Sequence, residues 1–157
     1  MIGTKNKKMI TLKRTTSDNP DFQKLTALFD EYLIDIDGDE KDFFAQYNQI
    51  YLNNVIVCYE DNTAIGCGAF KKYEPKIAEI KRMFVHPDHR GKKVASQVLT
   101  ELESWVKELH FSACILETSF KLENAIALYE KSGYVIMERY GQYKDVESSF
   151  CMQKSLK

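Results

Sequence analysis

A cluster of basic residues stands between a β-strand pattern and a strongly amphipathic helix pattern. It lies in the segment Val85–Ala95, which reads VHPDHRGKKVA. The first turn of a helix leaves backbone N–H groups unpaired and carries partial positive charge. Arg90, Lys92 and Lys93 add formal charge at the same point, so the segment predicts a site for an anion such as phosphate. The alternative is an ordinary solvated loop, because the glycine spacing matches neither a P-loop nor a dinucleotide-binding motif.

The cysteines and histidines have the spacing of neither a metal site nor a nucleophilic site. No pair of cysteines forms a C-x-x-C motif, and His86 and His89 flank Pro87 in an expected loop. The cysteines lie in or next to expected strands, where small buried thiols are common: Cys58, Cys67, Cys114 and Cys151. We therefore expect structural thiols, no metal site and a reduced, cytoplasmic protein.

Length and charge narrow the class of protein further. The 157 residues suit one domain over 1–157, with residues 1–7 expected to be loose. Twenty-two basic and 23 acidic residues leave a net charge of -1, which argues against a nucleic-acid or membrane-surface partner. No apolar run approaches the roughly 20 residues of a membrane helix, and the N-terminus lacks the apolar segment of a signal peptide.

Periodicity predicts the elements that must position these residues. Asp18 or Asn19 can cap the first helix next to Pro20, and Gly133 suits the left-handed end of the last helix. An antiparallel meander followed by strand–helix alternation predicts a mixed α/β sheet with helices packed on it. Strands are expected over 9–14, 55–59, 64–72, 77–85, 113–117, 134–138 and 149–153, and helices over 20–36, 41–49, 94–109 and 123–131.

Three segments together resemble the GNAT N-acetyltransferase superfamily, and the chain is similar to its small bacterial-type members. Arg90, Gly91 and Ala95 fit that family's acetyl-CoA loop, in which Lys93 stands at a position usually held by glycine. Segments 79–85 and 124–134 fit the strand before the loop and the late helix and strand. The resemblance implies a single-domain α/β GNAT-like fold with flanking helices. Its mixed, mostly antiparallel central sheet would have about six to seven strands.

The resemblance also implies acetyl-CoA as acetyl donor. The donor's pantetheine arm would pair like an additional strand with the backbone of Met83, Phe84 and Val85, and Asn124 would hydrogen-bond it. The strand with Glu79 and the strand 113–117 would part to admit the thioester. The pyrophosphate would lie on the backbone amides of the loop, which we expect to bind despite the lysine: Arg90, Gly91, Lys92, Lys93, Val94 and Ala95.

Glu79 is the candidate base, acting directly or through water. An amine with a pKa of about 10 is protonated at neutral pH and has no free lone pair, so its proton must be removed. Glu79 stands where the resembling family often carries a basic glutamate, and strand alternation would put it on one face with Lys81, Met83 and Val85. The alternative is a surface carboxylate paired with a neighbouring cation.

Tyr129 is the candidate acid. It follows Asn124 by five residues, as the family's thiol-facing tyrosine does, and a phenol can protonate the departing thiolate. The alternative is one more core aromatic among nine tyrosines.

The sequence indicates the binding site of the acceptor less clearly than that of acetyl-CoA. Acidic and aromatic side chains together would suit a cationic amine, whereas the alternative is a solvated acidic loop beside a core stripe. They follow in one region: Asp35, Asp37, Asp39, Glu40, Phe43, Phe44, Tyr47 and Tyr51. We predict acetyl transfer from acetyl-CoA to a primary amine of a small molecule, an amino acid or another amine, by direct nucleophilic attack.

Three other functions remain open at this point. They are acetyl transfer to a peptide or protein, non-catalytic sensing of acyl-CoA, and a binding module that uses the basic patch Arg90–Lys93. A homodimer is expected only at the level of the family.

Overall fold

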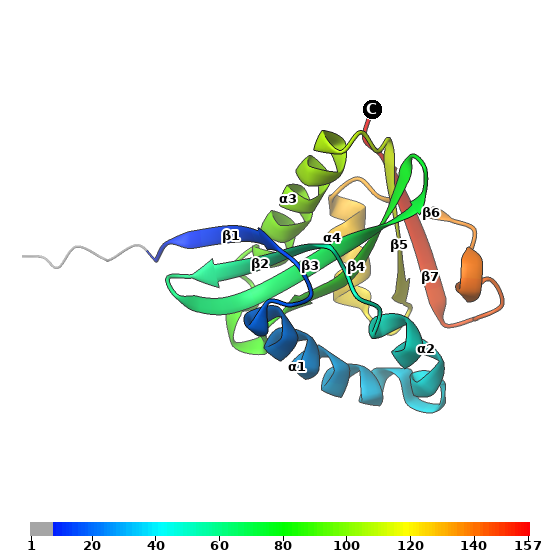
Figure 1. Cartoon of the computed structure of the whole chain (residues 1–157). Coiled ribbons are helices and arrows are strands. Elements are labelled where there is room, and N and C mark those ends of the chain that lie inside the picture. The colour runs from blue at the N-terminus through cyan, green and yellow to red at the C-terminus, as the bar shows by residue number, and fades with distance from the viewer. Residues whose placement is uncertain (1–7) are drawn as a thin grey trace, which may run out of the picture.

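A seven-stranded sheet forms the centre of the computed structural model, which describes residues 8–157 (Figure 1). The predicted loose segment 1–7 lies outside the described residues. The strand order is β1-β2-β3-β4-β5-β7-β6, and only β4 and β5 pair in parallel. This confirms the predicted mixed, mostly antiparallel sheet. The strands are β1 (Ile10–Thr15), β2 (Asn54–Glu60), β3 (Thr63–Glu74), β4 (Ile77–Val85), β5 (Ala113–Ser119), β6 (Val135–Met137) and β7 (Ser149–Ser155).

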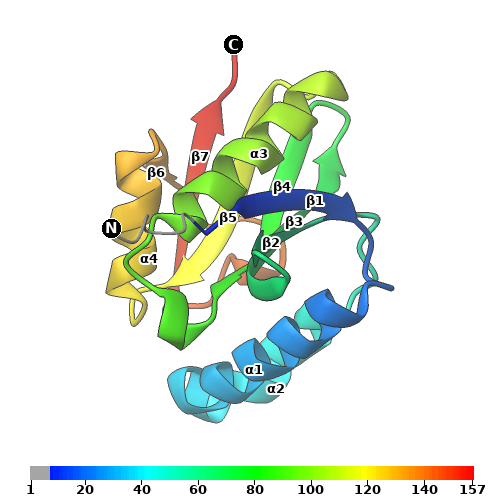
Figure 2. The same cartoon turned by 90° about the vertical axis from the view of Figure 1, so that its left-hand side faces the viewer.

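Four α-helices flank the sheet within the described chain. The α1 and α2 helices lie together on one side, and α3 covers the other (Figure 2). Each face therefore has its own apolar core, one against α1 and one against α3 and α4. The helices are α1 (Pro20–Asp37), α2 (Lys41–Asn48), α3 (Val94–Glu108) and α4 (Glu123–Lys131), with 3-10 turns η1 (Gly38–Glu40), η2 (Pro87–His89) and η3 (Gly141–Tyr143).

The ends of the helices follow local side-chain chemistry. Asn19, rather than Asp18, caps α1: its Oδ1 accepts hydrogen bonds from the backbone N–H groups of Asp21 and Phe22 at 2.9 and 3.0 Å. At the end of α4, Gly133 has φ +96°, a left-handed conformation that glycine adopts without a steric penalty. The sequence had predicted both the start of α1 and the end of α4.

A bulge at Arg82 changes which residues of β4 share a face. Arg82 has φ +58°, and the pairing of β3 with β4 shifts register there. Before the bulge, Ile80 packs into the core beside α3, so Glu79 points to the opposite face. After the bulge, Met83 and Val85 pack against that same α3 core. The prediction that they share a face with Glu79 is therefore wrong, because the additional residue reverses the alternation.

Two glycines of β3 let the start of α3 approach the sheet closely. A Cβ at Gly66 would lie 2.7 Å from Cγ1 of Val94, and one at Gly68 would lie 2.8 Å from Cγ1 of Val98. The first residue of α3 is thus seated directly over the central strands. This close packing places the open N-terminal turn of α3 beside the C-terminal end of β4.

Candidate active site

The strands β4 and β5 separate just beyond Glu79. They pair only through Ile77 with Ala113, Ala78 with Cys114, and Glu79 with Ile115, although both described strands run on. A cavity of about 670 Å³ opens at this point, between the two strands, α1 and the first turns of α3 and α4. The predicted parting of these strands is confirmed. It leaves one edge of β4 without a neighbouring strand.

The loop before α3 forms the second wall of the cavity. Lys93 precedes α3 with φ +63° and makes no side-chain cap, so the first amides of the helix remain open. Gly91 has φ +82° and free space around its Cα. Arg90 donates from Nε to the backbone oxygen of Val85 at 3.2 Å. The cavity is lined here by Arg90, Gly91, Lys93, Val94, Ala95 and Ser96, an arrangement that can hold an anion.

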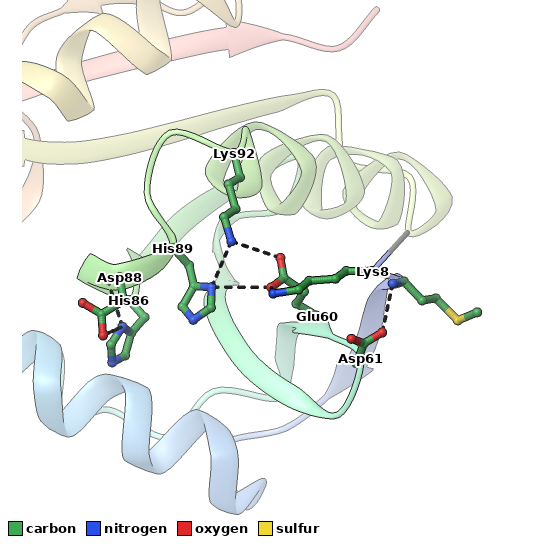
Figure 3. Close-up of polar contacts among 8 residues, drawn as sticks. Lys8, Glu60, Asp61, His86, Asp88, His89 and Lys92 are labelled. Atoms are coloured by element: carbon green, nitrogen blue, oxygen red, sulfur yellow. Dashed lines mark hydrogen bonds and ion pairs between the residues drawn. The ribbon is translucent and has the colours of Figure 1, made fainter. Parts of the chain in front are cut away.

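Lys92 is placed differently from the other predicted loop residues. Lys92 does not line the cavity; its side chain points toward Glu60, and Nζ lies 3.3 Å from Oε2 (Figure 3). The same carboxylate, only 8% exposed, lies 3.3 Å from Nζ of Lys8 and 3.8 Å from Nδ1 of His89. Burial alone raises the pKa of Glu60, but hydrogen bonds from Lys8 and Lys92 bring it below its usual value. The basic patch is thus divided: Arg90 and Lys93 line the cavity, whereas the charge of Lys92 is balanced by Glu60 outside it.

Glu79 lies at the point where the strands part. It is 3% exposed, so it is not a surface carboxylate. The hydroxyl of Tyr140 donates to its Oε2 at 2.6 Å, and Nζ of Lys81 lies 3.9 Å from its Oε1. Burial lowers the pKa of Lys81, which the charge of Glu79 partly offsets. The site therefore holds a carboxylate in a fixed orientation beside a buried ammonium group.

Glu117 is a functional candidate that the sequence analysis missed. It lies on β5, on the cavity wall, and accepts a hydrogen bond from Oγ of Ser149 at 2.7 Å. Burial raises its pKa to about 8, although Ser149 and the charge of Lys81 pull it down. An acidic residue directly after the apolar run Ala113–Leu116 was the signal that could have revealed it.

Tyr129 also reaches the cavity, together with Asn124 from the first turn of α4. Its side chain is 6% exposed, and its ring packs 5.8 Å from that of Tyr134. Burial, with the charge of Glu117, raises the pKa of Tyr129. The phenol therefore keeps its proton throughout the neutral range and is a weaker acid than free tyrosine.

The wall formed by α1 is held by Arg82. Its Nη2 lies 2.7 Å from Oδ1 of Asp30 and donates to the backbone oxygen of Thr26 at 3.2 Å. Its guanidinium lies 5.0 Å from the ring centre of Phe29, which stacks on Phe84. The bulge on β4 thus anchors α1, the helix that forms this wall of the cavity.

Most of the acidic and aromatic region Asp35–Tyr51, which begins in the last turn of α1, is not in the cavity wall. Only Asp37 and Phe44 of its eight residues line the cavity. Burial raises the pKa of Asp37, against the lowering effect of Lys121. Asp35 and Asp39 are exposed, as the alternative expects, but they lie on helical turns rather than in a loop, and Tyr51 is 52% exposed rather than part of a core.

The thiols are structural, as expected. All four cysteines are buried and free, and burial raises the pKa of Cys67 and Cys114 to about 12. Thiols with such pKa values are poor nucleophiles at neutral pH. In residues 8–157, no three His, Cys, Asp or Glu side chains gather as a metal site would require. No helix of that part is long and apolar enough to span a membrane.

The model of the acetyltransferase (GNAT) family matches residues 19–134. The chain belongs to the GNAT acetyltransferase family. The prediction of an acetyl-CoA-dependent N-acetyltransferase is thereby confirmed at the level of the family.

Alignments to several GNAT proteins span nearly the whole chain. An IAA acetyltransferase of Azospirillum brasilense is 29% identical over 150 residues, which are 94% of this chain and 98% of the relative. The structure of a GNAT family acetyltransferase from Elizabethkingia anophelis, with acetyl-CoA bound, has a TM-score of 0.70 at 19% identity, covering 97% and 100%. An IAA acetyltransferase from Bacillus cereus ATCC 14579 has a TM-score of 0.69 at 20% identity, covering 94% and 100%. These structures confirm the GNAT fold.

Proposed function

We propose that this GNAT protein transfers the acetyl group of acetyl-CoA to a primary amine of a small molecule by direct attack. The observation that carries the proposal is the separation of β4 and β5 beyond Glu79. It places an open strand edge, an anion-binding helix start and a buried carboxylate around one cavity.

The residues present fit acetyl-CoA, which supplies an activated acetyl thioester. The free edge of β4 at Met83, Phe84 and Val85 can pair with an extended amide-bearing arm as a further strand would. The amides of Arg90–Ala95 can hold the pyrophosphate, with Arg90 and Lys93 adding charge. Lys92 would contribute its backbone, since its side chain is bound to Glu60. Asn124, which lines the cavity from α4, would hydrogen-bond the arm's amides.

The chain's own groups would then manage protons and charge. Glu79 takes a proton from the attacking nitrogen, directly or through water. A backbone N–H near Phe84 or Val85 stabilises the negative charge that develops on the carbonyl oxygen. Tyr129 donates its hydroxyl proton toward the leaving sulfur as the C–S bond breaks. Because its pKa is raised, Tyr129 readily takes up a replacement proton and returns to the neutral phenol.

Closure at the acceptor end supports a small molecule rather than a peptide. Nζ of Lys121 donates to the backbone oxygen of Ile36 at 2.9 Å, and Oγ of Ser148 donates to Glu40 at 2.7 Å. These bonds tie the end of α1 and η1 to the loops that follow β5 and precede β7. An extended chain would have to break them to cross the site.

Two measurements in sequence test the proposal. Calorimetric titration should show acetyl-CoA binding in the micromolar range, roughly -8 kcal/mol, with no binding of ATP or NAD. Release of free thiol is then followed with a panel of small amines, amino acids, IAA and short peptides. Turnover of small primary amines is expected. Binding without any turnover would favour the acyl-CoA sensor, turnover of peptides alone a peptide acceptor, and absence of binding would overturn the proposal.

A further inference from the structure

The amine nitrogen has to lose two protons during the proposed reaction. A protonated amine loses one before it can attack, and the second leaves as the amide forms. Only one of the two is needed by the departing sulfur, so the other must reach solvent. Glu79 can accept one of these protons, so a second base in the cavity is needed to accept the other.

Glu117 occupies a position suited to that need. Ile115 pairs with Glu79, and Glu117 lies two residues further along β5, so it shares the face of Ile115 across the open gap from Lys81. It lines the same cavity as Glu79 and Tyr129. Its one side-chain hydrogen bond in the described chain comes from Ser149, a residue that is 2% exposed. Glu79, by contrast, is bound by the Tyr140 hydroxyl and lies beside Lys81.

Charged and titratable groups from several elements surround Glu117. Lys81 is the positive group that lowers its pKa, whereas the carboxylates of Asp37 and Glu79 raise it. Its own charge raises the pKa of tyrosine and cysteine groups on three neighbouring elements, namely Tyr129, Tyr143 and Cys151.

We infer that Glu117 is a second catalytic carboxylate, which binds the ammonium group of the acceptor and takes its first proton before attack. The inference rests on the proposed function. In this step a nitrogen–hydrogen bond breaks, its electron pair becomes the amine lone pair, and an oxygen–hydrogen bond forms on Glu117. The proton then passes to solvent, and Glu79 takes the second proton during attack. Ser149 acts as the positioning residue of Glu117.

The basicity of Glu117 suits this role. A carboxylate with a pKa of about 8 is a stronger base than an ordinary one. Proton transfer from an ammonium group with a pKa of about 10 is therefore far less unfavourable than transfer to a carboxylate near 4.

The test is the pH dependence of kcat/KM, measured with an acceptor whose own pKa lies near 10. The wild type should show a rise with a midpoint near pH 8. Glu117→Gln should lower kcat/KM at least tenfold at pH 8 and remove that rise. Glu79→Gln should lower the rate and leave the rise in place. Ser149→Ala should move the midpoint to higher pH, because the hydrogen bond that lowers the pKa of Glu117 is lost.

Ser132→Ala is the matched control, since Ser132 does not line the cavity and its hydroxyl donates to the backbone oxygen of Leu128 within its own helix turn. Its profile should equal that of the wild type. An active wild type whose profile is shared by Glu117→Gln, or by Ser149→Ala, overturns the role of Glu117 alone. A wild type that binds acetyl-CoA and acetylates no amine overturns the proposed function, and the role of Glu117 with it.

Discussion

Glu79 and Ile115 form the last pair through which the parallel strands β4 and β5 are joined. One pair further on, the two strands have separated and the cavity begins. The carboxylate of Glu79 therefore stands at the closed end of the gap, and Glu117 stands on the opposite strand where the gap is open. A single change in strand pairing thus creates both the space for the donor and the arrangement of the two acids.

Tyr129→Phe should reduce kcat at least tenfold while the KM for acetyl-CoA changes little. The variant keeps the ring in its packed position and removes only the hydroxyl that faces the cavity. Steady-state kinetics and acetyl-CoA calorimetry measure the two quantities separately. Tyr134→Phe is the control: its hydroxyl bonds to Glu103 rather than to the cavity, so it should cost stability and spare kcat. Equal losses of kcat and acetyl-CoA binding in Tyr129→Phe would make Tyr129 a packing residue.

Tyr140→Phe should destabilise the fold and slow catalysis together. Removing its 2.6 Å hydrogen bond leaves the buried Glu79 carboxylate without that donor, which costs about 2 kcal/mol for a bond to a charged group. Denaturant unfolding measures the first effect and kcat the second. Tyr73→Phe is a suitable comparison, because its ring packs at 5.1 Å against Tyr140 from a more exposed position. A Tyr140→Phe enzyme with full kcat would show that Glu79 needs no fixed orientation.

Lys93→Gly should stabilise the protein. Lys93 holds a left-handed backbone conformation at φ +63°, which costs a non-glycine residue about 1–2 kcal/mol, partly offset by the greater freedom of glycine in the unfolded chain. We expect a net gain of about 0.5–1 kcal/mol in the free energy of unfolding. Lys92→Gly, at a neighbour without a positive φ and with an ion pair to Glu60, should instead destabilise the protein. A loss of stability in Lys93→Gly would mean that its side chain, not its backbone, dominates.

Glu117→Gln should raise stability at alkaline pH. The pKa of this carboxyl is raised from 4.5 to about 8 on folding. Between those values the unfolded chain loses its proton first, so the wild type loses stability as pH rises from about 4.5 to 8. A neutral glutamine avoids this loss, and the gain should exceed about 1 kcal/mol, or roughly 2–4 °C in Tm, at pH 8.5. Melting curves at pH 4.5 and 8.5 provide the comparison, and equal gains at both values would contradict the raised pKa.

Much of the fold was predictable because its signals are local. The Asn19-Pro20 start of α1, the apolar stripe of α3 and the Gly133 end of α4 depend on neighbours a few residues away. The loop from Arg90 to Ala95 was likewise recognisable, since it combines charge, glycine and a helix start in one short segment.

The bulge at Arg82 and the positions of Tyr140 and Tyr143 were not predictable in the same way. A bulge depends on how β3 and β4 share their register, and a one-residue slip reverses every later side chain. Tyr140 and Tyr143 belong to an irregular segment around η3, and only the packing of that segment against β4 and β5 brings them to the site.

The sequence by itself determined the element order and the sheet class, because both depend on residue type and short spacing. Its resemblance to the GNAT family added the expected acetyl-CoA loop and the candidates Glu79 and Tyr129. The tertiary structure alone decided that Lys92 turns to Glu60 and that Glu117 joins the cavity, and it located the expected parting of β4 and β5 directly after Glu79. The physical reason is burial. The pKa of Glu117 rises because distant strands and helices remove its water and surround it with other charges, and no short stretch of sequence carries that information.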